Sequence, residues 1–340
     1  MSPTTVPDSR IAIIDFAPFL NGSNKREVAD AILESFKDIG FVYLLNHGIP
    51  QERVTQMFGM SKTFFAQPME IKQLAPHPPS GTHQRGYSAP GREKVTQHVY
   101  DPDAIAAHRA QAPDVKESFS CGRENDTVMP NIWLPDGVLP DFKETCLDFF
   151  WLCHEIGLKI LRALALGFGL DEEYFLKYHT TADNELALLH YPSVSTVALA
   201  NESVARIGPH SDFGSITLLL QDDVGGLEVE DPLVAGSFRP APPVPGALVV
   251  NAGDFMMRWS NDAIRSTIHR VRAPPGTASA GHEEMTPERY SIPYFCCADF
   301  DTTVDCIPGT WSDNENEGRP KKYEPISAKE YIMKRLAAIY

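Results

Sequence analysis

The sequence lacks any apolar run long enough to cross a membrane and any regular cysteine framework. No stretch of 18 apolar residues occurs in its 340 residues, so no transmembrane helix is expected. The N-terminal MSPTTVPDSR lacks the charged and apolar regions of a signal peptide, and the C-terminal RLAAIY carries no lipidation or peroxisomal motif. The six cysteines form no CxxC motif, so we expect reduced thiols. These absences predict a cytoplasmic protein with no membrane partner.

Positive charge is also scarce. Lys and Arg number 30 against 45 Asp and Glu, which gives a formal net charge of −15. An acidic surface repels nucleic acid and anionic membranes, so neither is an expected partner. A single Arg can still reverse the field inside a pocket, so a small anionic ligand is not excluded. The composition therefore favours a small-molecule substrate, and it leaves the oligomeric state open.

Hydrophobic periodicity divides the chain into an α-rich first half and a β-rich second half. The helical spacing of apolar residues predicts helices over 25–39, 51–65, 141–169, 171–178 and 327–338. Short strands are expected within 11–20 and at 41–45, and the stretch 76–115 is expected to be long and irregular. From about residue 185, short strand-like runs separated by Gly, Pro, Asn and Asp are typical of a β-sandwich or barrel. The predicted fold class is α+β with a jelly-roll core.

Four regions follow from this pattern. We expect an N-terminal region over 1–120, a long helical segment over 121–184 that supports the core, the jelly-roll core over 185–305, and a tail with a packed helix over 306–340.

A candidate metal site lies in the β-rich half. His210 and Asp212 are two residues apart at the expected start of a strand, where both side chains project from the same face. His269 lies in a later strand-like run, STIHRVRAP. Two histidines and one carboxylate can hold one face of a non-haem iron(II) ion and leave positions open for other ligands. An HxD pair alone is common by chance, and a later histidine proves little in a chain with 11 of them.

A second pattern adds weight to the first. Arg289 and Ser291 are also two residues apart in a strand-like run, RYSIPYF. A guanidinium can grip a carboxylate with two parallel hydrogen bonds, and a serine hydroxyl adds a third donor. The phenol of Tyr191 can donate to the same acid. The alternative is an Arg that is exposed or pairs with an internal acid, but an Arg pointing into a barrel needs an anion.

These motifs carry a family resemblance over nearly the full length. The chain resembles the isopenicillin N synthase-like branch of the 2-oxoglutarate/iron(II) dioxygenases in IAIIDFAPFL, SFKDIGFVYLLNHGIP, HSDFGSITLLLQDDVGGLEV, NAGDFMMRWSN, STIHRV and RYSIPYF. Within that branch, RGYSAPGREKVTQ, APDVKESFSCGRE, LLHYPSV and RWSND are similar to the fungal thymine dioxygenase-like group.

The resemblance implies a double-stranded β-helix in which Fe(II) is held by His210, Asp212 and His269. It also implies that Arg289 and Ser291, assisted by Tyr191, hold the C5 carboxylate of 2-oxoglutarate. O2 is then the second co-substrate, and ascorbate is the expected reductant.

The chain departs from the thymine-oxidising relatives in its expected substrate pocket. Those relatives have an Arg at the place of Ala187 and a Tyr at the place of Phe213, while the stacking aromatic is kept as Phe295. The change predicts a roomier and less polar pocket for a polyketide, terpenoid or alkaloid intermediate of fungal secondary metabolism. Two further pocket candidates have plainer alternatives: Arg206 as a solvated loop residue and Trp259 as core packing.

Several alternatives stay open. The reaction can be a hydroxylation, a desaturation or an oxidative rearrangement, and the substrate can instead be thymine or another pyrimidine. An iron oxidase that uses no 2-oxoglutarate, a zinc hydrolase with the same ligands and a non-enzymatic binder are further rivals. The segment 82–100 and the terminal helix are candidate lids, although GREKVTQ can equally be a solvated loop.

Overall fold

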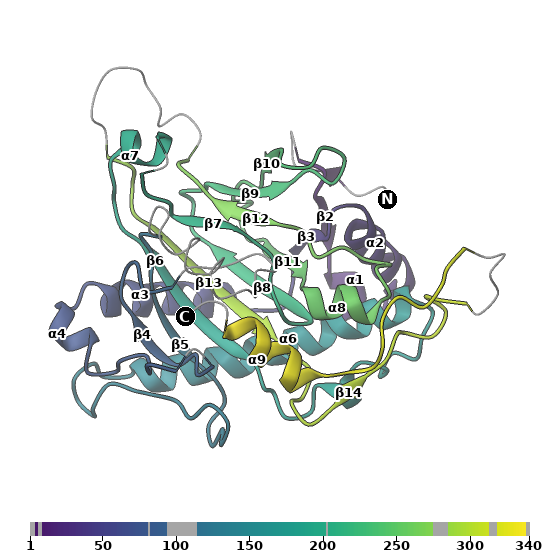
Figure 1. The fold of residues 1–340 in the computed structure, drawn as a ribbon, viewed down its shortest axis with the longest axis horizontal. Coiled ribbons are helices and arrows are strands. Elements are labelled where there is room, and N and C mark those ends of the chain that lie inside the picture. The colour runs from purple at the N-terminus through teal and green to yellow at the C-terminus, as the bar shows by residue number, and fades with distance from the viewer. Residues whose placement is uncertain are drawn as a thin grey trace.

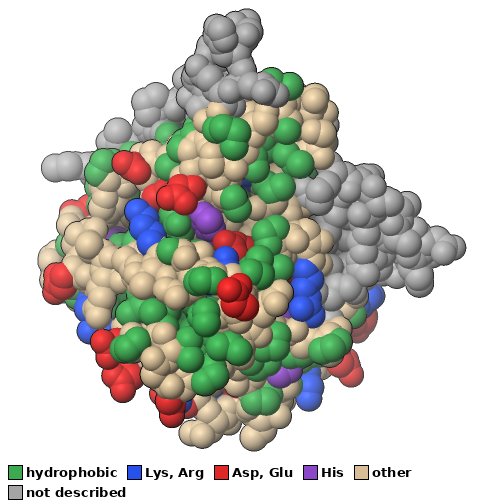
Figure 2. Space-filling view, turned by 90° about the vertical axis from the view of Figure 1, so that its left-hand side faces the viewer, with side chains coloured by type: hydrophobic (Ala, Val, Ile, Leu, Met, Phe, Trp, Pro, Cys, Tyr) green, Lys and Arg blue, Asp and Glu red, His purple; other side chains and the backbone are tan. Residues whose placement is uncertain are grey.

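The computed structural model describes residues 4–5, 9–80, 82–93, 114–201, 203–274, 285–312 and 318–337. No helix in these ranges is long and apolar enough to cross a membrane. Acidic and basic side chains are interspersed with hydrophobic ones on the face shown in Figure 2.

The predicted long helices are confirmed. The first half contains α1 (Ala17–Leu20), α2 (Lys25–Asp38), α3 (Gln51–Phe65), α4 (Met69–Lys72) and α6 (Phe142–Gly167). Later helices are α7 (Thr196–Ala200), α8 (Asp254–Trp259) and α9 (Ala328–Leu336), with a 3-10 helix η1 (Leu176–Tyr178). The helix predicted over 171–178 was wrong in extent. The Asp171 carboxylate accepts the Glu173 backbone N–H at 2.8 Å, a local turn that competes with helix formation.

A large mixed sheet forms the centre of the described part of the chain (Figure 1). Its strand order is β1-β2-β3-β11-β8-β13-β6-β5-β4. The strands are β1 (Thr4–Thr5), β2 (Ala12–Asp15), β3 (Phe41–Leu45), β4 (Gly86–Ser88), β5 (Glu117–Cys121), β6 (Glu185–Tyr191), β8 (Ile216–Gln221), β11 (Leu248–Ala252) and β13 (Arg289–Cys296). Strand β4 lies inside the stretch 76–115, so the prediction of an irregular segment was wrong there; backbone pairing of Tyr87 with Phe119 extends the sheet edge.

A smaller sheet faces the large one and completes the predicted jelly roll. Its order is β10-β9-β12-β7, with β7 (Ile207–His210), β9 (Leu227–Glu230), β10 (Phe238–Pro240) and β12 (His269–Val271). Tyr43 and Val249 of the large sheet pack in one cluster with Ile207 and Val229 of the small sheet. A separate short ribbon pairs β14 (Thr303–Val304) with β15 (Ile326–Ser327). The large sheet contains strands from two of the predicted regions, 1–120 and 185–305. The exact boundaries of the four predicted regions stay a prediction.

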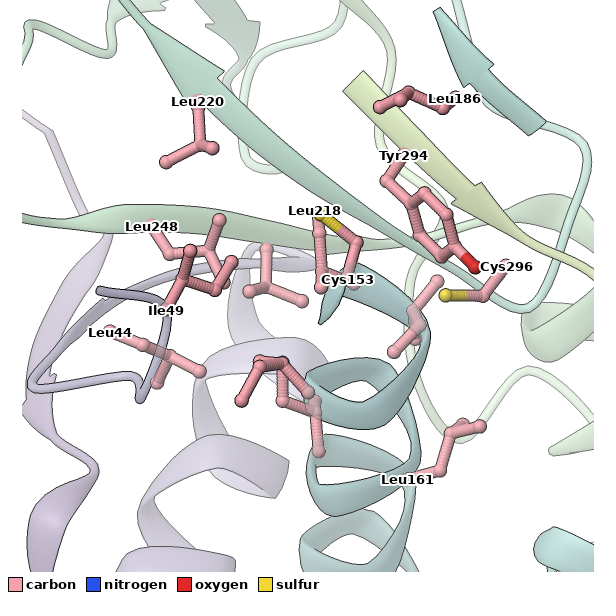
Figure 3. Close-up of a cluster of buried hydrophobic side chains, with 14 of the residues drawn as sticks. Leu44, Ile49, Cys153, Leu161, Leu186, Leu218, Leu220, Leu248, Tyr294 and Cys296 are labelled. Atoms are coloured by element: carbon pink, nitrogen blue, oxygen red, sulfur yellow. The ribbon is translucent and has the colours of Figure 1, made fainter. Parts of the chain in front are cut away.

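Alternation along the strands separates a packed face from a cavity face. Leu218 and Leu220 of β8 and Tyr294 and Cys296 of β13 lie in the buried cluster that includes residues of α6 such as Cys153 (Figure 3). Because successive side chains in a strand point to opposite faces, their neighbours in sequence point to the small sheet. The sheet therefore has an apolar face that rests on α6 and a second face that is free to build a site.

A buried ion pair fixes the C-terminal helix beside that second face. Arg335 of α9 pairs with Asp254 at the start of α8, and both side chains are 2% exposed. Asp254 also accepts the Ser211 hydroxyl at 2.8 Å, and the Arg335 guanidinium lies 4.2 Å from the centre of the Phe213 ring. Helix α9 is thus tied to the segment that carries His210 and Asp212.

Removing this cation should destabilise the fold. Arg335→Met leaves the Asp254 carboxylate buried without its cation, and we expect the free energy of unfolding to fall by about 3–5 kcal/mol. The matched control is Arg53→Met, which breaks the exposed pair with Asp148 and should change stability by less than about 1 kcal/mol. Denaturant unfolding measures both values; equal effects for the two variants would show that the buried pair does not hold α9.

Candidate active site

A cavity lies between the two sheets, and it contains most of the predicted site residues. Strands β6, β8, β11 and β13 of the large sheet supply one wall, and β7, β9 and β12 of the small sheet contribute to the other. Ile332 and Leu336 of α9 also line it. The cavity thus opens where the sequence predicts the metal and the co-substrate to meet.

His210, Asp212 and His269 come together as predicted. One potential ligand atom from each lies within 4.8 Å of the others, and this is the candidate metal cluster in the described residues. His210 and His269 are direct partners across β7 and β12, and their ring centres are 4.2 Å apart. Asp212 Oδ1 lies 3.7 Å from His269 Nε2. Such a set of two imidazoles and one carboxylate suits Fe(II) and leaves one side of the ion open.

The expected strand context of the HxD pair was wrong. His210 is the last residue of β7, and Asp212 lies in the loop before β8. The chain turns here because Gly214 packs on the Cys296 backbone, where an added Cβ would lie 2.4 Å from the Cys296 carbonyl oxygen. The turn still directs both ligand side chains to one point.

Backbone carbonyls set the orientation of both imidazoles. His210 Nδ1 lies 2.8 Å from the Gly208 carbonyl oxygen, and His269 Nδ1 lies 3.2 Å from that of Thr267. A carbonyl only accepts, so each Nδ1 donates and each Nε2 keeps a free lone pair for a metal. Burial, and then the neighbouring His269, lower the pKa of His210, which keeps this ring neutral as metal binding requires.

Two donors hold the carboxylate of Asp212. The Thr217 hydroxyl and the Asn251 amide donate to Oδ2 at 2.6 and 2.7 Å. Burial opposes ionisation, but the two histidines and these donors together lower the pKa of Asp212. With Oδ2 engaged, Oδ1 is the oxygen left to face the histidines and a metal.

Loss of one of these donors should weaken metal binding. In Asn251→Leu the Asp212 carboxylate loses an orienting hydrogen bond, and we expect the affinity for Fe(II) to fall about 10–100-fold. Anaerobic titration with Fe(II) measures it, with Asn201→Ala at an exposed position as the control. Unchanged iron affinity in Asn251→Leu would rule out this supporting role.

Arg289 is a buried cation that lacks an acidic partner in the described part of the chain. It is 1% exposed, donates to Ser291 Oγ at 3.1 Å and to Gln221 Oε1 at 3.2 Å, and has no partner for Nε. Its guanidinium lies 5.0 Å from the centre of the Tyr191 ring, and Tyr191 is its direct partner across β6 and β13. The Arg289 side chain is therefore not exposed, and it forms no direct ion pair in the described part of the chain, although the Asp222 carboxylate lies near enough to interact with its charge.

Arg206 does not lie where the sequence suggested. It is fully buried rather than solvated, and it is not among the described residues that line the cavity. It donates to the Pro287 carbonyl oxygen, while Nε and Nη1 have no partner. Burial, and then repulsion from Arg289, lower the pKa of Arg206 to about 10. The buried charge of Arg206 lies behind the cavity lining but near enough to Arg289 to add to its attraction for an anion such as a dicarboxylate.

The apolar substrate candidates fall into two groups. Ala187, Phe213 and Phe295 line the cavity as expected. Trp259 instead packs in the core, where its ring makes edge contacts with Phe175 at 5.0 Å and with other aromatic rings. It forms no cavity wall in the described structure because α8 turns its side chain toward the core behind the sheet.

The structure adds polar groups that the sequence reading missed. Lys116, just before β5, and Ser118 and Ser120 on β5 face the cavity. Glu93 pairs with Lys116 and accepts the Ser118 hydroxyl at 2.6 Å. Glu185 opens β6 and lines the same region. The period-two spacing of polar residues over 116–120 was the available signal.

Part of each candidate lid reaches the cavity. Gln84, Arg85 and Glu93 line it from the segment predicted as 82–100, and α9 lines it from the C-terminal side. Residues 94–100 lie outside the described residues, so that part of the lid prediction has no structural account. Glu93, the glutamate of GREKVTQ, has a side chain that is only 15% exposed and pairs with Lys116, so it is not part of a solvated loop.

Comparison with known families agrees with this site. A family described as "2OG-Fe(II) oxygenase superfamily" matches residues 177–298, and one described as "non-haem dioxygenase in morphine synthesis N-terminal" matches residues 11–136. The chain belongs to the 2OG-Fe(II) oxygenase superfamily. It is a 2-oxoglutarate-dependent dioxygenase that uses Fe(II), which confirms the predicted jelly-roll fold, enzyme class and cofactors.

Several similar proteins are fungal. The chain is 35% identical to a "2-oxoglutarate-Fe(II) type oxidoreductase ppzD" of Metarhizium majus, with 98% of this chain and 97% of the relative covered. It is 37% identical to a "Proline hydroxylase buaE" of Petromyces alliaceus, with 96% and 98% covered. Among solved structures, the full-length thymine-7-hydroxylase of Neurospora crassa in complex with alpha-KG is 41% identical, with a TM-score of 0.85 and 98% of both chains covered. That hydroxylase has also been solved with alpha-KG and thymine.

Proposed function

We propose that this protein oxidises a small, fairly apolar intermediate of fungal secondary metabolism, and that His210, Asp212 and His269 hold its Fe(II). The observation that carries the co-substrate assignment is the buried Arg289 guanidinium, which has no acidic partner in the described residues and shares the cavity with the metal cluster. The C5 carboxylate of 2-oxoglutarate is the anion that Arg289 and Ser291 would bind, with the Tyr191 phenol as a third donor.

Different residues of the chain have different roles in the proposed reaction. Fe(II) bound with 2-oxoglutarate and O2 supplies an oxidant that can break an unactivated C–H bond. His210, Asp212 and His269 would hold the Fe(II), and Arg289 would orient the co-substrate through its carboxylate. Ala187, Phe213 and Phe295 position the substrate and exclude water from the cavity. Free thiols at all six cysteine positions agree with the cytosolic location that the sequence predicts.

A substrate screen tests this proposal. Purified protein with Fe(II), 2-oxoglutarate and ascorbate is incubated with polyketide, terpenoid and alkaloid libraries, and products are detected by mass spectrometry. We expect the gain of one oxygen atom or the loss of two hydrogens, with one succinate formed per product. A product formed without succinate would favour an iron oxidase that uses no 2-oxoglutarate, and turnover of a zinc-loaded, iron-free enzyme would favour a hydrolase.

Pyrimidine oxidation is the second candidate, and the likeness to the Neurospora crassa thymine-7-hydroxylase favours it. Two positions in the cavity argue against it, because Ala187 and Phe213 offer no polar side-chain atom to a pyrimidine ring. We expect the wild-type protein to oxidise thymine poorly, and the double variant Ala187→Arg, Phe213→Tyr to raise kcat/KM for thymine at least about tenfold by adding hydrogen-bond donors. Assays of thymine oxidation with each variant decide this. Efficient thymine turnover by the wild type would contradict the expectation.

A further inference from the structure

The cavity contains one acidic side chain, outside the metal cluster, that forms no direct ion pair with the rest of the described chain. Among the described residues, four carboxylates line the cavity: Glu93, Asp183, Glu185 and Asp212. Lys116 pairs with the first, and Arg123 pairs with the second at 3.0 Å. The last belongs to the metal cluster. No direct ion pair within the described residues involves Glu185, although Arg85 and Lys116 lie near enough to favour its ionised form.

The contacts of Glu185 leave most of its acceptor capacity unused. It is half-buried, and Oε1 accepts the Ser120 hydroxyl at 2.6 Å, which fills one of about four acceptor positions of a carboxylate. The nearby Arg85 guanidinium donates instead to the Gln84 carbonyl oxygen at 2.7 Å and to Asp126 at 3.4 Å. Burial raises the pKa of Glu185, and Arg85 opposes this. The carboxyl is therefore destabilised as an anion until another donor meets it.

Glu185 lies in the sheet at a distance from the metal cluster that one small molecule can span. It is the direct cross-strand partner of Phe295, which in turn is the partner of Thr217. The Thr217 hydroxyl donates to Asp212. Since neighbouring strands are about 4.8 Å apart, Glu185 and Thr217 are about 10 Å apart on the cavity floor. A ligand anchored at Glu185 would cross the Phe295 ring on its way to the metal.

We infer that Glu185 binds a basic nitrogen of the substrate. This deepens the proposed function and rests on it: the substrate is an apolar molecule that carries a protonated amine, as alkaloids and amino-acid derivatives do, rather than a nitrogen-free terpenoid or polyketide. The ammonium group would donate a charge-assisted hydrogen bond to the carboxylate. The adjoining Phe295 ring adds a cation–π contact on the same side of the cavity. Neither Ala187 nor Leu189, the next cavity-facing residues of β6, can provide such recognition.

Matched pairs of probes test the inference. The probes are L-proline against cyclopentanecarboxylic acid, and tetrahydroisoquinoline carboxylic acid against tetralin carboxylic acid; within a pair, only the nitrogen differs. We expect the full-length protein with Fe(II), 2-oxoglutarate and ascorbate to form succinate slowly without a substrate and faster when a substrate is bound. We expect at least one amine to accelerate succinate formation about tenfold more than its nitrogen-free partner, the effect of one charge-assisted hydrogen bond.

Variants locate the effect at Glu185. In Glu185→Gln the acceleration by the amine should fall about tenfold, and in Phe295→Leu it should fall about threefold. The control is Glu228→Gln, which removes a carboxylate that pairs with Arg270 outside the cavity lining and should behave as the wild type. The probe pairs keep the test valid even if Glu185→Gln fails to fold, because they need only the wild-type protein.

The outcomes separate this inference from the proposed function. Equal acceleration by amines and nitrogen-free partners, acceleration by no amine, or full acceleration retained in Glu185→Gln would overturn the inference alone. A wild-type protein that forms no succinate with any probe, or without one, would overturn the proposed function instead.

Discussion

Turnover should disappear when His269 is replaced by alanine, because the metal then loses one of three protein ligands. Loss of a residue that only orients a metal ligand typically lowers metal affinity or activity about 10–100-fold. We expect the loss of a ligand itself to lower the rate of succinate formation by more than about 100-fold. The fold should persist, since the His269 ring lies at the cavity wall, where it contacts the rings of His210 and Phe41. Iron content after anaerobic reconstitution and the succinate rate measure the two consequences.

The control for this variant is His83→Ala, whose imidazole contacts the Pro130 carbonyl oxygen at 2.9 Å away from the metal cluster. It should keep both iron content and turnover. If His269→Ala bound Fe(II) like the wild type and turned over, His269 would not be a ligand, and another residue would have to take its place.

The KM for 2-oxoglutarate should rise steeply when Arg289 is replaced by glutamine. The guanidinium is buried in the cavity wall, so its loss removes the charge that meets the C5 carboxylate and leaves the anion in a poorly solvated place. Breaking a buried charge pair of this kind costs about 2–5 kcal/mol, which corresponds to a rise in KM of about 30-fold or more. Ser291→Ala removes a single neutral donor and should raise KM by about tenfold or less.

Arg270→Gln is the matched control, because Arg270 follows the proposed metal ligand His269 in sequence but pairs with Glu228 outside the cavity lining. Its KM should stay at the wild-type value. A KM for 2-oxoglutarate that is unchanged in Arg289→Gln, or equally raised in Arg270→Gln, would show that the cavity Arg is not the co-substrate anchor.

Residue type and local spacing were enough to predict which side chains meet in the cavity. His210 and Asp212, and Arg289 and Ser291, are each two residues apart, a spacing that places both side chains on one face of an extended strand. Even so, β7 ends at His210, and the pair works across a turn whose cause, contact of Gly214 with a distant strand, has no local sequence signal.

The surroundings of the centre depend on pairing between strands, which local patterns do not specify. Arg206 is close to the HxD pair in sequence, but the backbone buries it beside Arg289 and away from the cavity lining. In the sequence, Glu185 is simply a polar residue at the start of an apolar strand. Its cross-strand pairing with Phe295 is what places it in the substrate cavity. Asn251 supports Asp212 from a strand 39 residues away, and no spacing rule identifies it.

The most direct measurement is an anaerobic titration of the metal-free protein with Fe(II) and 2-oxoglutarate, followed by exposure to O2. Chelation of iron by the co-substrate gives a visible charge-transfer absorption. We predict that this band forms with one iron per chain, that it is lost in His269→Ala and needs far more 2-oxoglutarate in Arg289→Gln, and that O2 then converts 2-oxoglutarate to succinate. Absence of the band and of succinate in the wild-type protein would contradict the account.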